Sequence, residues 1–139
     1  MKVVIVLLYV LIATSSAYAI ESEQMNFKYM NYEGDMILHC KHFAIDEYKF
    51  DWDLTCKNET GSFFKKFRAH VALSKYGHPT PPLSTYEVLY WVTDLTNNQT
   101  YGTGTSLWFN FNNDADFHSL TISQSVDNDT AGLYLDIKP

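Results

Sequence analysis

The chain contains 139 residues, of which 16% are aromatic, and it carries a formal net charge of −6 at neutral pH. This length corresponds to one domain, and the aromatic residues provide enough apolar surface for a hydrophobic core. The acidic charge argues against nucleic acid, heparin or an anionic membrane surface as the partner.

The first nineteen residues have the organisation of a secretory signal peptide. Lys2 provides a positive start, residues 3–13 form an almost unbroken apolar run, and Ala17-Tyr18-Ala19 matches a small-x-small cleavage site. The run is shorter than the roughly 20 residues that span a bilayer, and a signal anchor is the alternative. Removal of residues 1–19 predicts a secreted, extracellular domain of residues 20–139, in which no stretch is apolar enough to span a membrane.

Alternation of apolar and polar residues dominates the rest of the chain and indicates β-strands. The clearest run covers residues 48–56, in which Trp52 and the other even-numbered positions are apolar and the odd-numbered ones are polar. Further strands are expected over residues 36–41, 67–73, 86–94, 105–111, 118–123 and 132–137. Polar turns separate these strands, and the Pro-rich residues 77–82 predict a loop. The pattern predicts a single all-β domain, an antiparallel two-sheet sandwich.

The sequence has two cysteines, Cys40 and Cys56, which enclose fifteen residues. An even number of cysteines in an oxidising compartment predicts an intrachain disulfide bond. Two free thiols, or one thiol that pairs between chains, are the alternatives. An intrachain bond of this span would stabilise the fold by roughly 3 kcal/mol in the chain-entropy account.

Three sequons of the Asn-x-Ser/Thr type begin at Asn58, Asn98 and Asn128, and none has proline in the middle position. In a secreted chain they predict a glycoprotein in which one or more of these asparagines is used. Each used sequon would mark a turn that faces solvent.

Motifs for catalysis and metal binding are weak in this sequence. His39 and Cys40 are adjacent on an expected strand, so their side chains point to opposite faces and cannot share a metal ion without distortion. No G-x-S-x-G elbow occurs. We therefore expect no enzyme, no metal and no cofactor, with a small secreted enzyme as a less favoured alternative.

The candidate partner-binding residues are aromatic and come from two expected strands: Tyr86, Tyr90, Trp91 and Trp108. Both faces of the first strand carry large apolar side chains, so one exposed aromatic patch is expected. Tyr and Trp commonly anchor protein–protein interfaces. The alternative is that these side chains belong to the core or to a second layer.

Two further features bear on the partner. The acidic net charge of the whole chain favours a basic protein. The chain ends soon after Tyr134, which predicts that the last strand leaves an open sheet edge. Such an edge can pair with a second copy or with the partner, so a homodimer through an edge strand is a further expectation.

Two segments resemble an immunoglobulin domain. Cys40 precedes Trp52 by twelve positions, similar to the spacing between the cysteine of one immunoglobulin strand and the buried tryptophan of the next. Residues 118–136 resemble the stretch SLTI…D-x-A-G-x-Y-x-C, with Tyr134 at the tyrosine-corner position. Asp136 stands where the second cysteine is expected, so the resemblance implies that Cys40 pairs with Cys56 instead. Another antiparallel β-sandwich is the alternative fold.

The pattern is most similar to immunoglobulin-like secreted glycoproteins of large DNA viruses, of the poxvirus, adenovirus early-region and cytomegalovirus types. The resemblance implies a protein that binds a host immune protein, either a cytokine or a cell-surface receptor, as an immune-evasion decoy or ligand. A host lymphocyte-adhesion or recognition immunoglobulin module is the alternative function.

Overall fold

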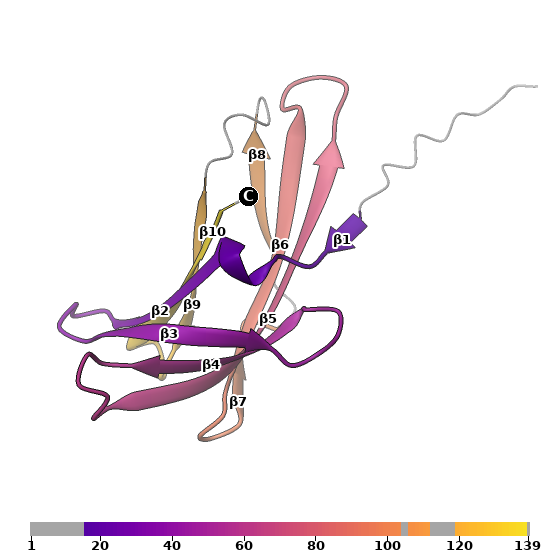
Figure 1. Ribbon diagram of the computed structural model, residues 1–139. Coiled ribbons are helices and arrows are strands. Elements are labelled where there is room, and N and C mark those ends of the chain that lie inside the picture. The colour runs from indigo at the N-terminus through magenta and orange to yellow at the C-terminus, as the bar shows by residue number, and fades with distance from the viewer. Residues whose placement is uncertain (1–15, 104–105, 112–118, 139) are drawn as a thin grey trace, which may run out of the picture.

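The computed structural model describes residues 16–103, 106–111 and 119–138. Residues 1–15 of the expected signal peptide, and the ends of two expected strands at Thr105 and His118, lie outside these ranges. The described residues form ten strands and one short 3-10 helix, so the all-β expectation is confirmed (Figure 1). The elements are β1 (Ser16–Tyr18), η1 (Ser22–Gln24), β2 (Met25–Asn31), β3 (Ile37–Ala44), β4 (Asp51–Lys57), β5 (Phe64–Gly77), β6 (Ser84–Asp94), β7 (Gln99–Tyr101), β8 (Ser106–Phe111), β9 (Leu120–Val126) and β10 (Ala131–Ile137).

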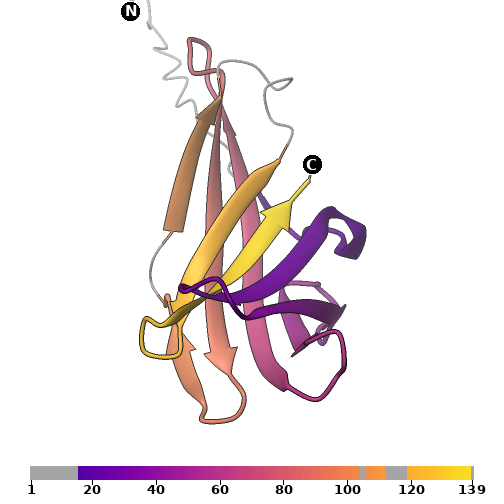
Figure 2. The same cartoon turned by 90° about the vertical axis from the view of Figure 1, so that its left-hand side faces the viewer.

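The ten strands belong to one antiparallel sheet. Its order is β7-β6-β5-β4-β3-β2-β10-β9, with β1 added to β5 and β8 added to β6. The sheet coils until β6 and β7 come into contact with β9, so that it nearly closes into a barrel (Figures 1 and 2). No helix in the described part of the chain is long and apolar enough to cross a membrane.

The immunoglobulin-like two-sheet sandwich is not confirmed. An immunoglobulin domain places the strand of the first cysteine and the strand of the tryptophan in opposite sheets. Here β3 and β4 are paired neighbours, with Cys40 opposite Cys56 and Ala44 opposite Trp52. The last strand, β10, pairs with β2 on one side and with β9 on the other. The expected open edge at the last strand is therefore wrong.

Tyr134 also departs from the tyrosine-corner expectation. Its neighbours Leu133 and Leu135 are buried, whereas Tyr134 is half-buried on the outer face of β10. Its ring lies over Gly132, where an added Cβ atom would come within 2.9 Å of the Tyr134 Cε2 atom. Within the described residues the Tyr134 hydroxyl has no hydrogen-bond partner, so it ties no corner of the chain.

The disulfide bond between Cys40 and Cys56 is confirmed. The two residues face each other across the paired strands β3 and β4, and Cys56 is fully buried. The bond therefore joins neighbouring strands of the same sheet. It does not bridge two sheets as the usual immunoglobulin disulfide does.

The core fills the inside of the coiled sheet, and β4 shows how the sequence builds it. Trp52, Leu54 and Cys56 point inward and are buried, while the residues between them are outward and partly exposed. Trp52 is 2% exposed, which confirms the expectation that it is a core residue. Its indole nitrogen donates to the Lys49 carbonyl at 3.0 Å, so the buried polar atom is satisfied.

A polar cluster ties three parts of the sheet together at one end of the barrel. Asp127, in the β9–β10 turn, accepts a hydrogen bond from the Tyr29 hydroxyl of β2 and forms an ion pair with Lys65 of β5. The Lys65 ammonium lies 4.9 Å from the centroid of the Tyr29 ring. Burial, reinforced by the hydrogen bond to Asp127, raises the pKa of the Tyr29 hydroxyl, which therefore stays a neutral donor.

Trp52→Ala should lower the free energy of unfolding by about 3–5 kcal/mol, because it removes a large side chain from a filled core. The matched control is Trp108→Ala, since Trp108 is 54% exposed and its loss should change stability by about 0.5 kcal/mol or less. Urea denaturation of the purified variants measures both. An effect of Trp52→Ala no larger than that of Trp108→Ala would contradict the burial of Trp52 described above.

Candidate binding face

The structure separates the four aromatic residues that the sequence proposed as partner-binding. Tyr86 and Tyr90 point inward from β6 and are 5% and 4% exposed. Trp91 and Trp108 lie on the outer face of the sheet, from β6 and β8. The alternative interpretation, that the residues belong to the core, therefore describes Tyr86 and Tyr90, and these two have no surface to offer a partner.

Tyr90 has a structural role inside the barrel. Its hydroxyl donates to the carbonyl of Leu133, on β10, at 3.0 Å. Strands β6 and β10 are not neighbours in the sheet order, so this hydrogen bond crosses the interior between two walls. Burial raises the pKa of the Tyr90 hydroxyl, which keeps it protonated and able to donate.

Trp91 and Trp108 differ in how far they are engaged by their neighbours. Trp91 stacks on His70, with ring centroids 3.8 Å apart and planes 5° from parallel. His70 in turn contacts Asp51, with 2.9 Å between Nδ1 and Oδ1. Trp108 is more than half exposed, and its ring centroid lies 5.5 Å from that of Tyr76. Of the four proposed residues, Trp108 is the one whose surface is largely free.

A different surface gathers exposed cationic and aromatic side chains, and we call it the β3–β5 face. It is the outer face of three adjacent strands, formed by His39, Lys41 and Phe43 of β3, Thr55 and Lys57 of β4, and Phe64 and Lys66 of β5. The strand register places these side chains in rows. Lys57 lies between His39 and Phe64, and Thr55 lies between Lys41 and Lys66.

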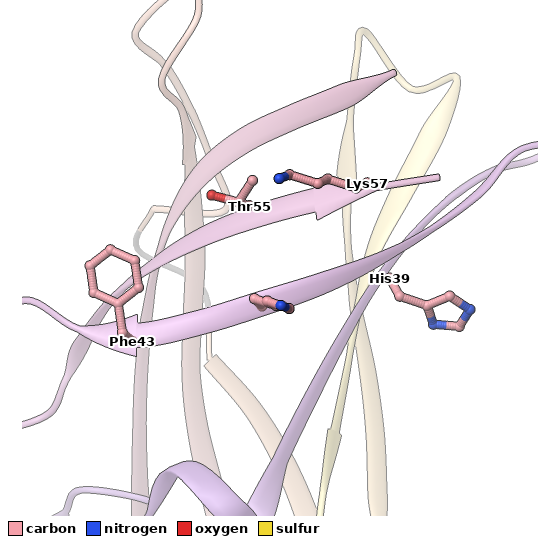
Figure 3. Close-up of a pocket in the computed structure, with 5 residues that line it drawn as sticks. His39, Phe43, Thr55 and Lys57 are labelled. Carbon is pink, nitrogen blue, oxygen red and sulfur yellow. The ribbon is translucent and has the colours of Figure 1, made fainter. Parts of the chain in front are cut away.

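The β3–β5 face is hollowed by two adjoining grooves, of about 330 and 410 Å³. Thr55 and Lys57 of β4 line both, so the two grooves adjoin at the side chains of this middle strand. Phe43 stands at one end of the first groove, and His39 and Lys57 lie toward the other (Figure 3). Gly61 and Phe64 border the second groove. Cationic groups therefore line both grooves, and each groove has one aromatic ring, Phe43 in the first and Phe64 in the second.

The β3–β5 face is basic, although the chain as a whole is acidic. Within the described residues, Lys41, Lys57 and Lys66 form no ion pair with a carboxylate. The nearby Asp53 is already engaged by Arg68, with 2.9 Å between Nε and Oδ1. The Lys66 ammonium lies 5.9 Å from the centroid of the Phe64 ring. The three lysines thus present positive charge that the fold does not neutralise.

This chemistry suits non-covalent recognition. Lysines attract an anionic group over several ångströms, and exposed rings provide apolar contact once the partner has arrived. Phe43 and Phe64 are 59% and 56% exposed, respectively. The residues that the structure describes include no group of three or more His, Cys, Asp or Glu side chains arranged to hold a metal ion.

The three sequons lie in turns, as the sequence predicted. Asn58 is in the β4–β5 turn, Asn98 in the β6–β7 turn and Asn128 in the β9–β10 turn. All three turns lie at the same end of the molecule, the lower end in Figures 1 and 2. Asn98 and Asn128 are exposed, and the Asn58 amide donates to the Ser62 hydroxyl at 3.1 Å. Glycosylation of these asparagines stays a prediction.

Comparison with protein-family models, curated proteins and solved structures finds no match to this chain. The β3–β5 face is therefore interpreted from its own geometry and charge. One signal in the sequence points to this face. The odd-numbered positions 39, 41 and 43 share one side of a strand and combine two basic residues with a phenylalanine.

Tyr90→Phe should lower the free energy of unfolding by about 1 kcal/mol, because the buried hydrogen bond to the Leu133 carbonyl is lost. Tyr134→Phe is the control, since it removes a hydroxyl without a partner among the described residues and should have an effect near zero. Chemical denaturation of both variants measures the difference. A tyrosine corner at Tyr134 would reverse this order, so the reversed result contradicts the packing described above.

Proposed function

We propose that this chain is a secreted single-domain glycoprotein that binds an acidic surface of a host immune protein, a cytokine or a cell-surface receptor, through its β3–β5 face. The observation that carries the proposal is the set of unneutralised lysines beside exposed phenylalanines on one open sheet face. The expected signal peptide and the disulfide bond support an extracellular location. The protein acts by binding and has no catalytic role.

The charge of the face revises the kind of partner inferred from the sequence. The net charge of −6 favoured a basic partner. Charges separated by more than about 8 Å are largely screened at physiological ionic strength. The local charge of the β3–β5 face therefore affects a bound partner more than the net charge of the whole chain does. Lys41, Lys57 and Lys66 favour an acidic partner surface, and Phe43 and Phe64 favour one that also offers apolar side chains.

Immune evasion by a virus is the biological setting that we propose for this binding. Its support is the resemblance of the Cys40–Trp52 spacing and of residues 127–136 to immunoglobulin-like viral glycoproteins. An immunoglobulin-like sandwich is part of the same resemblance. Because β3 and β4 pair within one sheet, any such relationship lies in the sequence motifs and not in the strand order.

Lys57→Glu should slow association with the partner by about tenfold, because it reverses a charge at the centre of the two grooves. Lys138→Glu is the matched control, since it makes the same charge change at an exposed position outside the face. The measurement is surface plasmon resonance of the secreted protein against a panel of cytokines and leukocyte receptor ectodomains. Each interaction is recorded at low and at high salt.

Binding to a member of the panel that weakens with salt and with Lys57→Glu, and not with Lys138→Glu, is the expected result. A partner that binds both variants equally well would place the site elsewhere. The absence of any binder in the panel would contradict the proposal of an immune protein as the partner.

A further inference from the structure

One edge of β5 is covered in its first half by β4 and in its second half by β1. Strand β4 pairs with β5 from Phe64 to His70, and the Phe50 carbonyl accepts the N–H of Val71 at 2.9 Å. Beyond that point, Leu73–Lys75 pair with the three residues of β1 on the same side. Strand β6 occupies the opposite side of β5 along this stretch.

The strand that covers this edge lies inside the expected signal peptide. Cleavage after Ala19 removes β1 as a whole, since β1 ends at Tyr18. Alternate residues of a strand direct their backbone N–H and C=O groups to the same edge. Val71 donates toward the β4 side, so Leu73 and Lys75 point to the edge that β1 vacates. The secreted chain therefore gains an open edge at these two residues.

We propose that the secreted protein covers this edge with the same edge of a second copy, as a two-fold symmetric dimer. Strand β1 shows that the edge accepts an antiparallel strand, with Ala17 opposite Ser74. A two-fold axis at Ser74 places Leu73 opposite Lys75 of the second copy. Each of these pairs then exchanges two backbone hydrogen bonds. The surface is complementary to itself, as a two-fold interface must be.

The side chains at the edge fit this arrangement. On the outer face, the side chains of Ala72 and Ser74 are small, so two sheets can join there without a large side chain of these residues between them. On the inner face, the Lys75 ammonium lies 5.7 Å from the centroid of its own Tyr86 ring. Lys75 would face Leu73 across the axis and not the second Lys75, so like charges are not directly opposite.

The expected glycans leave this edge accessible. The three sequon turns lie at the lower end of the molecule in Figures 1 and 2, whereas β1 lies along the upper half of β5. Pairing would extend from Ala72 to Tyr76. At one end the pairing stops at Val71, because the Val71 N–H already donates to the Phe50 carbonyl. At the other end it stops at the β5–β6 hairpin, where the His78 N–H donates to the Leu83 carbonyl.

The test uses the full chain expressed in secreting cells, with the processed protein purified from the medium. Intact mass and N-terminal sequencing define its first residue, and size-exclusion chromatography with light scattering gives its mass over a range of concentrations. We expect a chain that begins at Ile20 and forms a dimer. A secreted protein that retains β1, or one that begins at Ile20 and is monomeric throughout, would overturn the proposal.

Two variants of Lys75 locate the interface. Lys75→Pro removes an N–H group that points to the open edge and spares the ladder to β6, a position where strands tolerate proline. We expect this variant to be monomeric. Lys75→Ala keeps the N–H group and should remain a dimer. A Lys75→Pro protein that is still dimeric would place the interface on another surface.

Ser74→Cys gives an independent readout if Lys75→Pro fails to fold. Residues opposite each other in a pair without hydrogen bonds have Cα atoms about 4.5 Å apart, which is within the range of a disulfide bond. We expect a covalent dimer on a non-reducing gel. Thr121→Cys, at an exposed position of β9, should give none. A Ser74→Cys protein that stays monomeric on that gel would overturn the proposed register.

Discussion

The fold depends on one constraint: a single antiparallel sheet must bury one of its two faces. Among the described residues there is no second sheet or helical layer for it to pack against. The sheet therefore coils, and side chains from opposite parts of its inner face pack against each other. Phe27, Trp52 and Phe67 fill the interior from strands β2, β4 and β5. The hydrogen bond from Tyr90 to the Leu133 carbonyl then joins walls that no strand pairing connects. The coiling of the sheet is therefore what buries the core.

Strand β5 links this constraint to the surfaces that are proposed to bind. It is the longest strand, and its two halves have different neighbours. The first half sends Phe67 and Ala69 into the core, while Phe64 and Lys66 on the other side contribute to the β3–β5 face. The second half extends beyond β4 as a hairpin with β6 (Figure 1). One strand therefore contributes to the core, to the β3–β5 face and to the edge that the proposed removal of β1 would open.

Local alternation predicted much of this structure, and its limits have a physical origin. On β4 one face is polar, so the burial of Trp52 followed directly from the sequence. On β6 both faces carry large apolar side chains, and alternation alone could not decide whether Tyr90 or Trp91 points inward. The order of the strands cannot be predicted from the local sequence pattern either. A coiled sheet and a two-sheet sandwich both need apolar and polar residues to alternate along each strand, so the alternation does not distinguish them. The ion pair between Asp127 and Lys65 depends on that order, so no local pattern in the sequence indicates it.

The two proposed surfaces are geometrically related. In an antiparallel pair, opposite residues point to the same side of the sheet, so a two-fold axis at Ser74 is perpendicular to the sheet. The outer faces of both copies would then form one continuous surface, with a β3–β5 face on each side of the axis. Two salt-dependent sites held in this way would act together, since the second contact becomes intramolecular. A dimer would therefore favour acidic partners that are themselves dimeric or densely arrayed on a cell surface.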